Sequence, residues 1–144
     1  ALLYGARGLF AASGDVTRDD FALFVSQLAL ASRFPGVQGI GFSRWLNPPG
    51  ADTGAAARAA ALTRGGALAL RLWPDAREAP RAEYHAIAYL EPLDARNAAA
   101  LGYDMHADAA RRAAMDRARD TGRPSASARV ELKQEIDRAT RQMG

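Results

Sequence analysis

Apolar side chains recur at helical spacing near the amino terminus and alternate with polar ones further along the chain. Residues 1–13 carry leucine and phenylalanine at helical spacing, which predicts an amphipathic helix that a Ser-Gly pair ends. A second helix is predicted to begin after Thr17, whose side chain can cap it, and to end before Pro35.

Four later segments have the apolar runs and the proline or glycine boundaries that are typical of strands. They cover residues 37–46, 67–74, 83–92 and 125–135. Between them, alanine-rich patterns predict helices over about 53–63 and 107–121, and the stretch LDARNAAALG predicts a short helical turn. Short connections between strands favour an antiparallel sheet with flanking helices, so the fold class is predicted to be α+β.

Glycines interrupt the first predicted strand in the stretch FPGVQGIGFSRW, residues 34–45. Residues two apart in a strand share a face, so Gly39, Gly41 and Ser43 leave one face of the sheet nearly bare. Glycine in a strand usually marks a close approach of another segment, which favours a helix packed tightly on the sheet. The alternative is room for a ligand over the sheet.

The composition suits one domain of 144 residues and 15.3 kDa. The net charge is +3 and the sequence pI is about 9.8, but the arginines alternate with acidic residues and form no basic stripe with interleaved aromatics. The charge pattern therefore indicates a solvated surface and no nucleic-acid partner. No apolar run approaches the roughly 20 residues of a membrane span.

Catalytic chemistry finds little support in the sequence. The chain has no cysteine, so it offers no thiol nucleophile. Its two histidines, His85 and His106, lack metal-ligand spacing, and a third ligand would have to be a carboxylate. No serine lies in a nucleophile motif, and the glycines around residue 39 lack the lysine of a phosphate loop. We therefore predict no enzyme, no metal site and no cofactor.

Two aspartates allow more than one role. Asp94 is expected to cap the helical turn after Pro92. Asp104 could cap a helix that begins near residue 107 or could face a ligand. The aromatic residues Trp73, Tyr84, Tyr89 and Tyr103 are typical of a core, although such residues can also line a ligand pocket.

Several blocks of the sequence, in order, resemble the CHASE domain. They include FPGVQGIGFSRWL, LRLWP, EYHAIAYLEPLDARNAAALGYDM and RRAAMDRARDTGRPSASARVELKQE, so the resemblance covers nearly the whole chain. It implies an extracytoplasmic sensor of membrane histidine kinases or cyclases, with a PAS-like sheet and a long N-terminal helix that continues from a membrane span. The expected organisation is an N-terminal helical segment over residues 1–33 and a PAS-like sensor domain over 34–144.

The chain departs from the family pattern in two places. The family continues past the glutamine-rich segment into a further apolar strand, whereas this sequence ends at Met143-Gly144. We therefore expect a piece of a longer protein that lacks its C-terminal strands and membrane-proximal part, with a polar tail after about Glu135. Plant members bind adenine-type hormones through an aspartate just before the third strand, where this chain has Arg81-Ala82. Arg71 and Arg81 could instead suit an anionic ligand.

The resemblance, together with the bare glycine face, predicts one ligand cavity against the sheet. Its expected lining is Trp73, Tyr89, Tyr103, Asp104, Met105 and Ser127, with Gly39 or Gly41 at the floor. The predicted function is a periplasmic sensor that binds a small molecule and signals to a kinase or cyclase. The alternative is a dimerisation or interaction module without a ligand. A homodimer is expected through Leu2, Leu3, Leu9 and Phe10, with membrane contact only through absent flanking helices.

Overall fold

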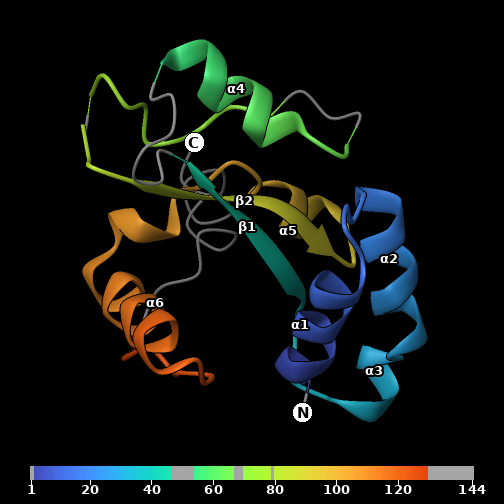
Figure 1. The fold of residues 1–144 in the computed structure, drawn as a ribbon. Coiled ribbons are helices and arrows are strands. Elements are labelled where there is room, and N and C mark those ends of the chain that lie inside the picture. Colours follow the sequence, from blue (N-terminus) through green and yellow to red (C-terminus); the bar gives the residue numbers. More distant parts are fainter. Residues whose placement is uncertain (1, 47–53, 67–69, 79, 130–144) are drawn as a thin grey trace, which may run out of the picture.

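Two antiparallel strands form the centre of the structure (Figure 1). The computed structural model describes residues 2–46, 54–66, 70–78 and 80–129. In that part of the chain, β1 (Ile40–Leu46) pairs with β2 (Tyr84–Glu91). The observed fold is mixed helix and strand with an antiparallel sheet, which confirms the α+β prediction at that level.

Helices surround the strand pair (Figure 1). The three N-terminal helices lie together on one side, α6 lies on the opposite side, and α4 lies along the strands. Their bounds are α1 Leu2–Ala12, α2 Arg18–Gln27, α3 Leu30–Arg33, α4 Ala55–Thr63, α5 Ala95–Ala98, the 3-10 helix η1 Met105–Ala107 and α6 Ala109–Thr121. The N-terminal segment is thus divided between separate helices.

Side-chain caps explain where several helices begin. Thr17 accepts a hydrogen bond from the Asp20 backbone and Asp20 returns one, a capping box at the start of α2. Asp94 accepts from the Asn97 backbone, which confirms its predicted capping role at α5. Asp108 caps α6 in the same way.

A register shift divides the strand pair into two dissimilar faces. Phe42 pairs with Tyr89 but Ser43 pairs with Ile87, so Ala88 is an extra residue in β2. One extra residue moves the following side chains to the opposite face. Tyr89 therefore shares a face with Phe42, while Ile87 lies on the glycine face.

The core lies on the face of the sheet that carries Tyr89. Phe21 of α2 is fully buried there and packs 5.7 Å from the Tyr89 ring, centroid to centroid. Phe10 of α1 stacks on Phe42 at 4.2 Å. Leu62 of α4 closes the same cluster. Burial of these side chains, at roughly 25 cal/mol per Å² of apolar surface, holds the helices against the strands.

Two of the expected strands need correction. Residues 70–74 do not form a strand. Trp73 makes one isolated parallel bridge to Tyr103, in which its N–H donates to the Gly102 carbonyl and its carbonyl accepts from the Asp104 N–H. Residues 102–104 lie between this segment and β2, with Gly102 N–H donating to the Ile87 carbonyl at 2.8 Å. Residues 125–129 are also not a strand, and the rest of the segment predicted over 125–135 lies outside the described residues, as do residues 67–69.

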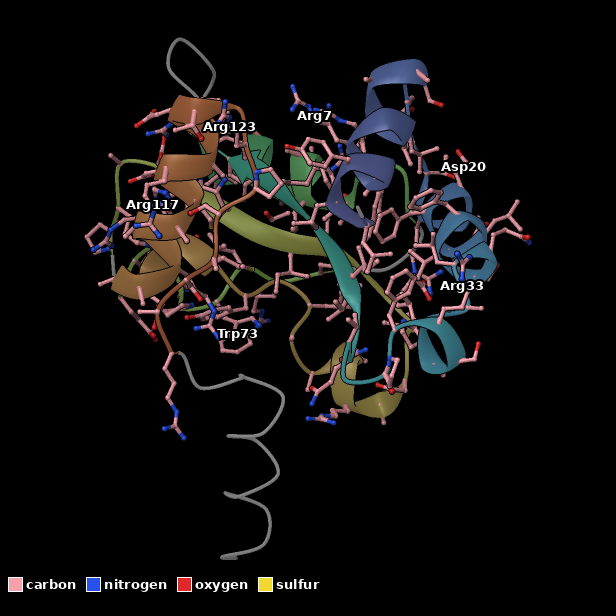
Figure 2. All side chains as sticks on the ribbon, turned by 90° about the horizontal axis from the view of Figure 1, so that it is seen from below. Arg7, Asp20, Arg33, Trp73, Arg117 and Arg123 are labelled. Atoms are coloured by element: carbon pink, nitrogen blue, oxygen red, sulfur yellow. The ribbon has the colours of Figure 1, made fainter. Side chains whose placement is uncertain are left out.

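Arginines are distributed around the domain. Figure 2 shows Arg33 on α3 and Arg117 on α6 at opposite sides. Arg7 of α1 donates to the Gly122 carbonyl at 2.9 Å and so joins α1 to the end of α6. These arginines, unlike those of a nucleic-acid-binding stripe, serve separate parts of the surface.

Gly102 offers a direct test of the close approach between segments. Its φ is +83°, and an added Cβ would collide with the Arg71 carbonyl oxygen. Gly102→Ala should therefore lower the free energy of unfolding by more than about 1 kcal/mol, measured by urea denaturation. Gly8→Ala in α1 is the matched control, because a Cβ there meets nothing and should stabilise the helix by about 0.5–1 kcal/mol. Equal effects of the two substitutions would contradict the predicted collision.

Candidate functional site

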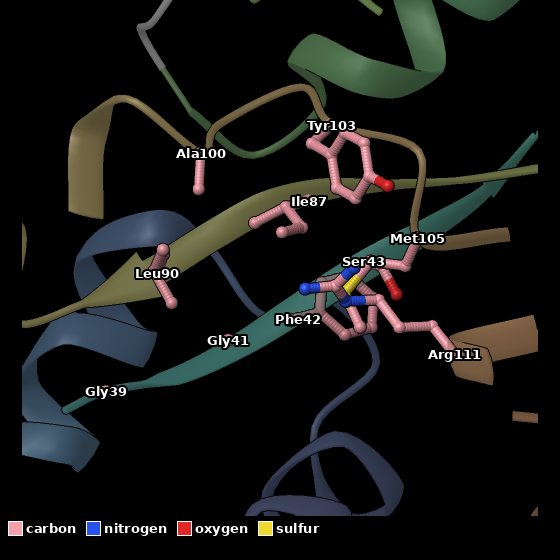
Figure 3. A pocket seen from close by; sticks show the side chains of 10 residues that line it. All are labelled: Gly39, Gly41, Phe42, Ser43, Ile87, Leu90, Ala100, Tyr103, Met105 and Arg111. Atoms are coloured by element: carbon pink, nitrogen blue, oxygen red, sulfur yellow. The ribbon is translucent and has the colours of Figure 1, made fainter. Parts of the chain in front are cut away.

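A cavity of about 320 Å³ lies on the glycine face of the sheet (Figure 3). Its size is within the range of small-molecule sites. It opens between the two strands, the segment before η1, and the first turn of α6. The lining residues are Gly39, Gly41, Phe42, Ser43, Ile87, Leu90, Ala100, Tyr103, Met105 and Arg111.

Gly39 and Gly41 have no side chains to fill this face, and neighbouring atoms lie too close to accept a Cβ at either position without shifting. An added Cβ at Gly41 would lie 3.0 Å from the Tyr89 carbonyl oxygen and 3.1 Å from Leu90 Cδ1. At Gly39 it would lie 3.1 Å from the Asn97 amide nitrogen. Asn97 of α5 closes the space over Gly39, whereas the atoms nearest to a Cβ at Gly41 come from β2, and Leu90 lies over both glycines. Both readings of the glycine pattern are thus partly met: a close approach and an open face.

Arg111 and Tyr103 give the cavity its polar groups. Arg111 is buried, reaches into the cavity from the start of α6, and lies 5.6 Å from the Tyr103 ring centroid. Its Nη1 lies 3.5 Å from an Asp108 carboxylate oxygen. Burial raises the pKa of the Tyr103 phenol, and the positive charge of Arg111 partly opposes that shift. Tyr103 therefore remains a neutral phenol at neutral pH.

Asp104 lies behind the cavity wall and is fully buried. Its carboxylate accepts hydrogen bonds from Arg81 Nε at 2.6 Å and from the backbone N–H groups of His85 at 2.8 Å and His106 at 2.9 Å. Its bond to His106 caps η1, whereas α6, the helix expected from about residue 107, is capped by Asp108. These partners occupy both carboxylate oxygens, and Arg81, expected to suit a ligand, is paired here instead.

The expected lining of the cavity is met only in part. Gly39, Gly41, Tyr103 and Met105 come together as expected. Tyr89 does not, and its assignment to the same cavity is wrong, because the extra residue Ala88 turns it to the core face. Its hydroxyl donates to the Val16 carbonyl at 2.8 Å.

Three other expected lining residues lie outside the cavity. The Trp73 ring contacts Tyr103 from behind, at 4.7 Å between centroids, and its indole donates to the Leu101 carbonyl. Asp104 is enclosed by its own partners. Ser127 is exposed beyond the end of α6, since its segment does not form the expected strand. Their placement in a common cavity is therefore corrected.

Comparison with known families identifies the chain. A family model described as CHASE domain matches residues 14–144. The chain belongs to the CHASE domain family. CHASE domains are extracellular sensory domains of receptors and are not themselves catalytic. No curated protein matches this CHASE domain.

Sequence reasoning missed the charged residue of the cavity in this CHASE domain. Arg111 and Ala114 are the buried residues of α6, three apart on one helix face. The spacing of Arg111 and Ala114 was the available signal, because residues three apart share a helix face. The other arginines of α6 made this one residue hard to distinguish. Within the described ranges, no helix has the length and hydropathy needed to cross a bilayer.

Asp104 should be the most sensitive polar position of the domain. Asp104→Asn keeps the shape but leaves Arg81 without its carboxylate, so the free energy of unfolding should fall by about 3 kcal/mol. Chemical denaturation followed by circular dichroism measures this change. Asp19→Asn is the control, because Asp19 is 95% exposed and its contact with Arg18 is screened by solvent. A variant as stable as the control would contradict the role assigned to Asp104.

Proposed function

We propose that this CHASE domain is the extracytoplasmic ligand-sensing part of a membrane receptor, which binds a small molecule in the cavity over Gly39 and Gly41. The observation that carries the proposal is the position of the cavity. Residues from two of the blocks that resemble the family line it: the glycine strand and the segment around Tyr103 and Met105. The family itself is sensory.

The lining favours a ligand with an apolar body and one acidic group. Ile87, Leu90 and Ala100 provide apolar surface, and Ser43 and Tyr103 provide hydroxyl groups. Arg111 is the charged member of the lining, and a buried guanidinium favours a carboxylate, because its donors match a planar oxyanion. Such a ligand would bridge β1, β2 and α6.

Signalling requires the ligand to favour one of two arrangements of the receptor. A molecule in this cavity contacts both the strands and α6, so its binding energy would depend on the position of α6 against the sheet. We propose that the sheet has a PAS-like architecture in the receptor. The domain would lie in the periplasm and signal to a cytoplasmic kinase or cyclase.

A thermal-shift experiment tests the cavity with benzoate as the anionic aromatic probe and adenine as the neutral one. Benzoate should raise the melting temperature of the wild-type chain as a ligand of the folded state, and adenine should raise it less. Ser43→Trp, which fills the cavity, should abolish the benzoate shift. Ser13→Trp is the matched control at an exposed site. An equal benzoate shift in the wild-type chain and Ser43→Trp would contradict binding in this cavity.

The charge of Arg111 can be tested separately. Arg111→Gln should remove most of the benzoate shift, because the guanidinium is the proposed partner of the carboxylate. Arg33→Gln removes an exposed positive charge from α3 and should leave the shift unchanged. A shift that survives Arg111→Gln but not Ser43→Trp would keep the cavity and overturn the anionic ligand.

A second candidate, an interaction module without a small-molecule ligand, is favoured by the exposed apolar side chains of α1. Leu3 is 56% exposed and Tyr4 53%. The other members of the predicted dimer stripe, Leu2, Leu9 and Phe10, pack at least partly against the domain's own core. We propose that the chain forms a parallel homodimer in which the two copies contact each other through Leu3 and Tyr4.

Sedimentation at micromolar concentration checks this assembly. The wild-type chain should sediment as a dimer, and Leu3→Ser with Tyr4→Ser should shift it to monomer, because the substitutions remove the apolar contact surface. Leu23→Ser is the control, since Leu23 is 63% exposed on α2. A wild-type monomer would contradict the dimer through α1.

A further inference from the structure

Three side chains that commonly bind metals converge near the start of β2. They are Glu83, just before the strand, His85 within it, and His106 in η1. Each directs one ligand atom to a common point, and these atoms lie within 4.8 Å of one another. The two histidines are distant in sequence, and the carboxylate that a third ligand requires is supplied by Glu83.

The two separations from Glu83 to the histidines are close to those between the ligands of a tetrahedral ion. Glu83 Oε1 lies 3.5 Å from His85 Nε2 and 3.6 Å from His106 Nδ1. Zinc bonds of about 2.0–2.1 Å in a tetrahedron place ligand atoms about 3.3 Å apart. An ion could therefore enter with side-chain shifts of a few tenths of an ångström at these two pairs.

Outer hydrogen bonds orient two of the three ligands. His106 Nε2 lies 2.9 Å from Asp116 Oδ1, an acceptor to which it can donate, and Nδ1, on the other side of the ring, lies 3.6 Å from Glu83 Oε1 and is the atom available to an ion. A histidine bound between a metal and a carboxylate has this arrangement. The Trp45 indole donates to Glu83 Oε2 at 3.1 Å and leaves Oε1 directed at the histidines.

The third ligand, His85, makes no hydrogen bond through Nε2, the atom that would bind the ion. His85 Nε2 is buried and has no hydrogen-bond partner among the described residues. A buried polar atom without a partner is costly, and a bound cation would satisfy it.

The backbone at both histidines is held by Asp104, the buried acid next to Tyr103 of the cavity wall. Asp104 Oδ1 accepts from the backbone N–H groups of both His85 and His106. The two imidazole rings consequently lie 4.5 Å apart, centroid to centroid. A site with ligands held by such supporting bonds loses little conformational entropy when an ion binds.

We propose that Glu83, His85 and His106 bind a divalent transition-metal cation, with zinc as the best match, and that Asp116 is a positioning residue behind His106. The set of two histidines and one carboxylate is a known zinc combination and leaves a fourth position for water. The ion would fasten β2 to η1 and, through Asp116, to α6.

Arg119 provides the competing explanation. Its Nη1 lies 3.3 Å from Glu83 Oε1, and it also approaches Asp116 and Asp120 at 3.5 Å each. The cluster could therefore be an ion-pair network alone. Arg119 is 47% exposed at the side chain and can turn to its two aspartates when an ion takes Glu83. Arg119→Ala removes a competing positive charge and should leave zinc affinity equal or higher.

Titration of the chain, purified without a polyhistidine tag, with zinc and with cobalt tests the site. Zinc should raise the melting temperature with one ion per chain, and cobalt should give the visible absorption of a tetrahedral site. His85→Gln and His106→Gln should each abolish both signals. Asp116→Asn keeps the three ligands and should weaken zinc binding by about 10–100-fold.

Glu78→Gln, which removes an exposed acid outside the cluster, is the matched control and should bind zinc as the wild-type chain does. Circular dichroism without metal establishes that each variant is folded. The proposal is overturned if zinc does not bind the wild-type chain, or if it binds folded His85→Gln and His106→Gln as tightly. A stronger loss from Arg119→Ala than from the histidine variants would also overturn it, in favour of the ion-pair network.

Discussion

One buried carboxylate organises the part of the domain where its functional features lie. Asp104 has no exposed surface, and burying a charge without partners would destabilise the fold severely. The charge is balanced by Arg81 and by two backbone N–H groups, while the Asp104 N–H bonds to the Trp73 carbonyl. One residue thus joins β2, η1 and two loops.

This arrangement places the segment 102–104 beside β2, and two features depend on its position. Tyr103 and Met105 face the cavity on either side of Asp104. His106 faces Glu83 and His85 further along the same strand. The proposed ligand cavity and the proposed metal site therefore adjoin, and both contact η1 or α6. Binding at either site would therefore affect how η1 and α6 pack against the strands.

One face of the strand pair carries the apolar core and the other carries the cavity. The Tyr89 face packs against α2 and α4 and holds the apolar core. The Gly41 face has lost side chains and accommodates a cavity, at a cost in strand stability that the core face offsets. Because the two faces are separate, the proposed ligand would enter the cavity without opening the core.

The sequence by itself determined α1, α4 and α6, both paired strands, the caps at Thr17 and Asp94, and membership of the family, because these follow from local periodicity, capping chemistry and ordered motifs. It did not separate α3 from α2, nor did it indicate η1. The tertiary structure decided which side chains meet. Simple alternation places Tyr89 on the face of Ile87, and only the extra residue at Ala88 turns it to the core. Likewise, His85 and His106 lack any metal-ligand spacing along the chain. They meet at Glu83 because Asp104 bonds to both backbones, a long-range contact that no local pattern encodes.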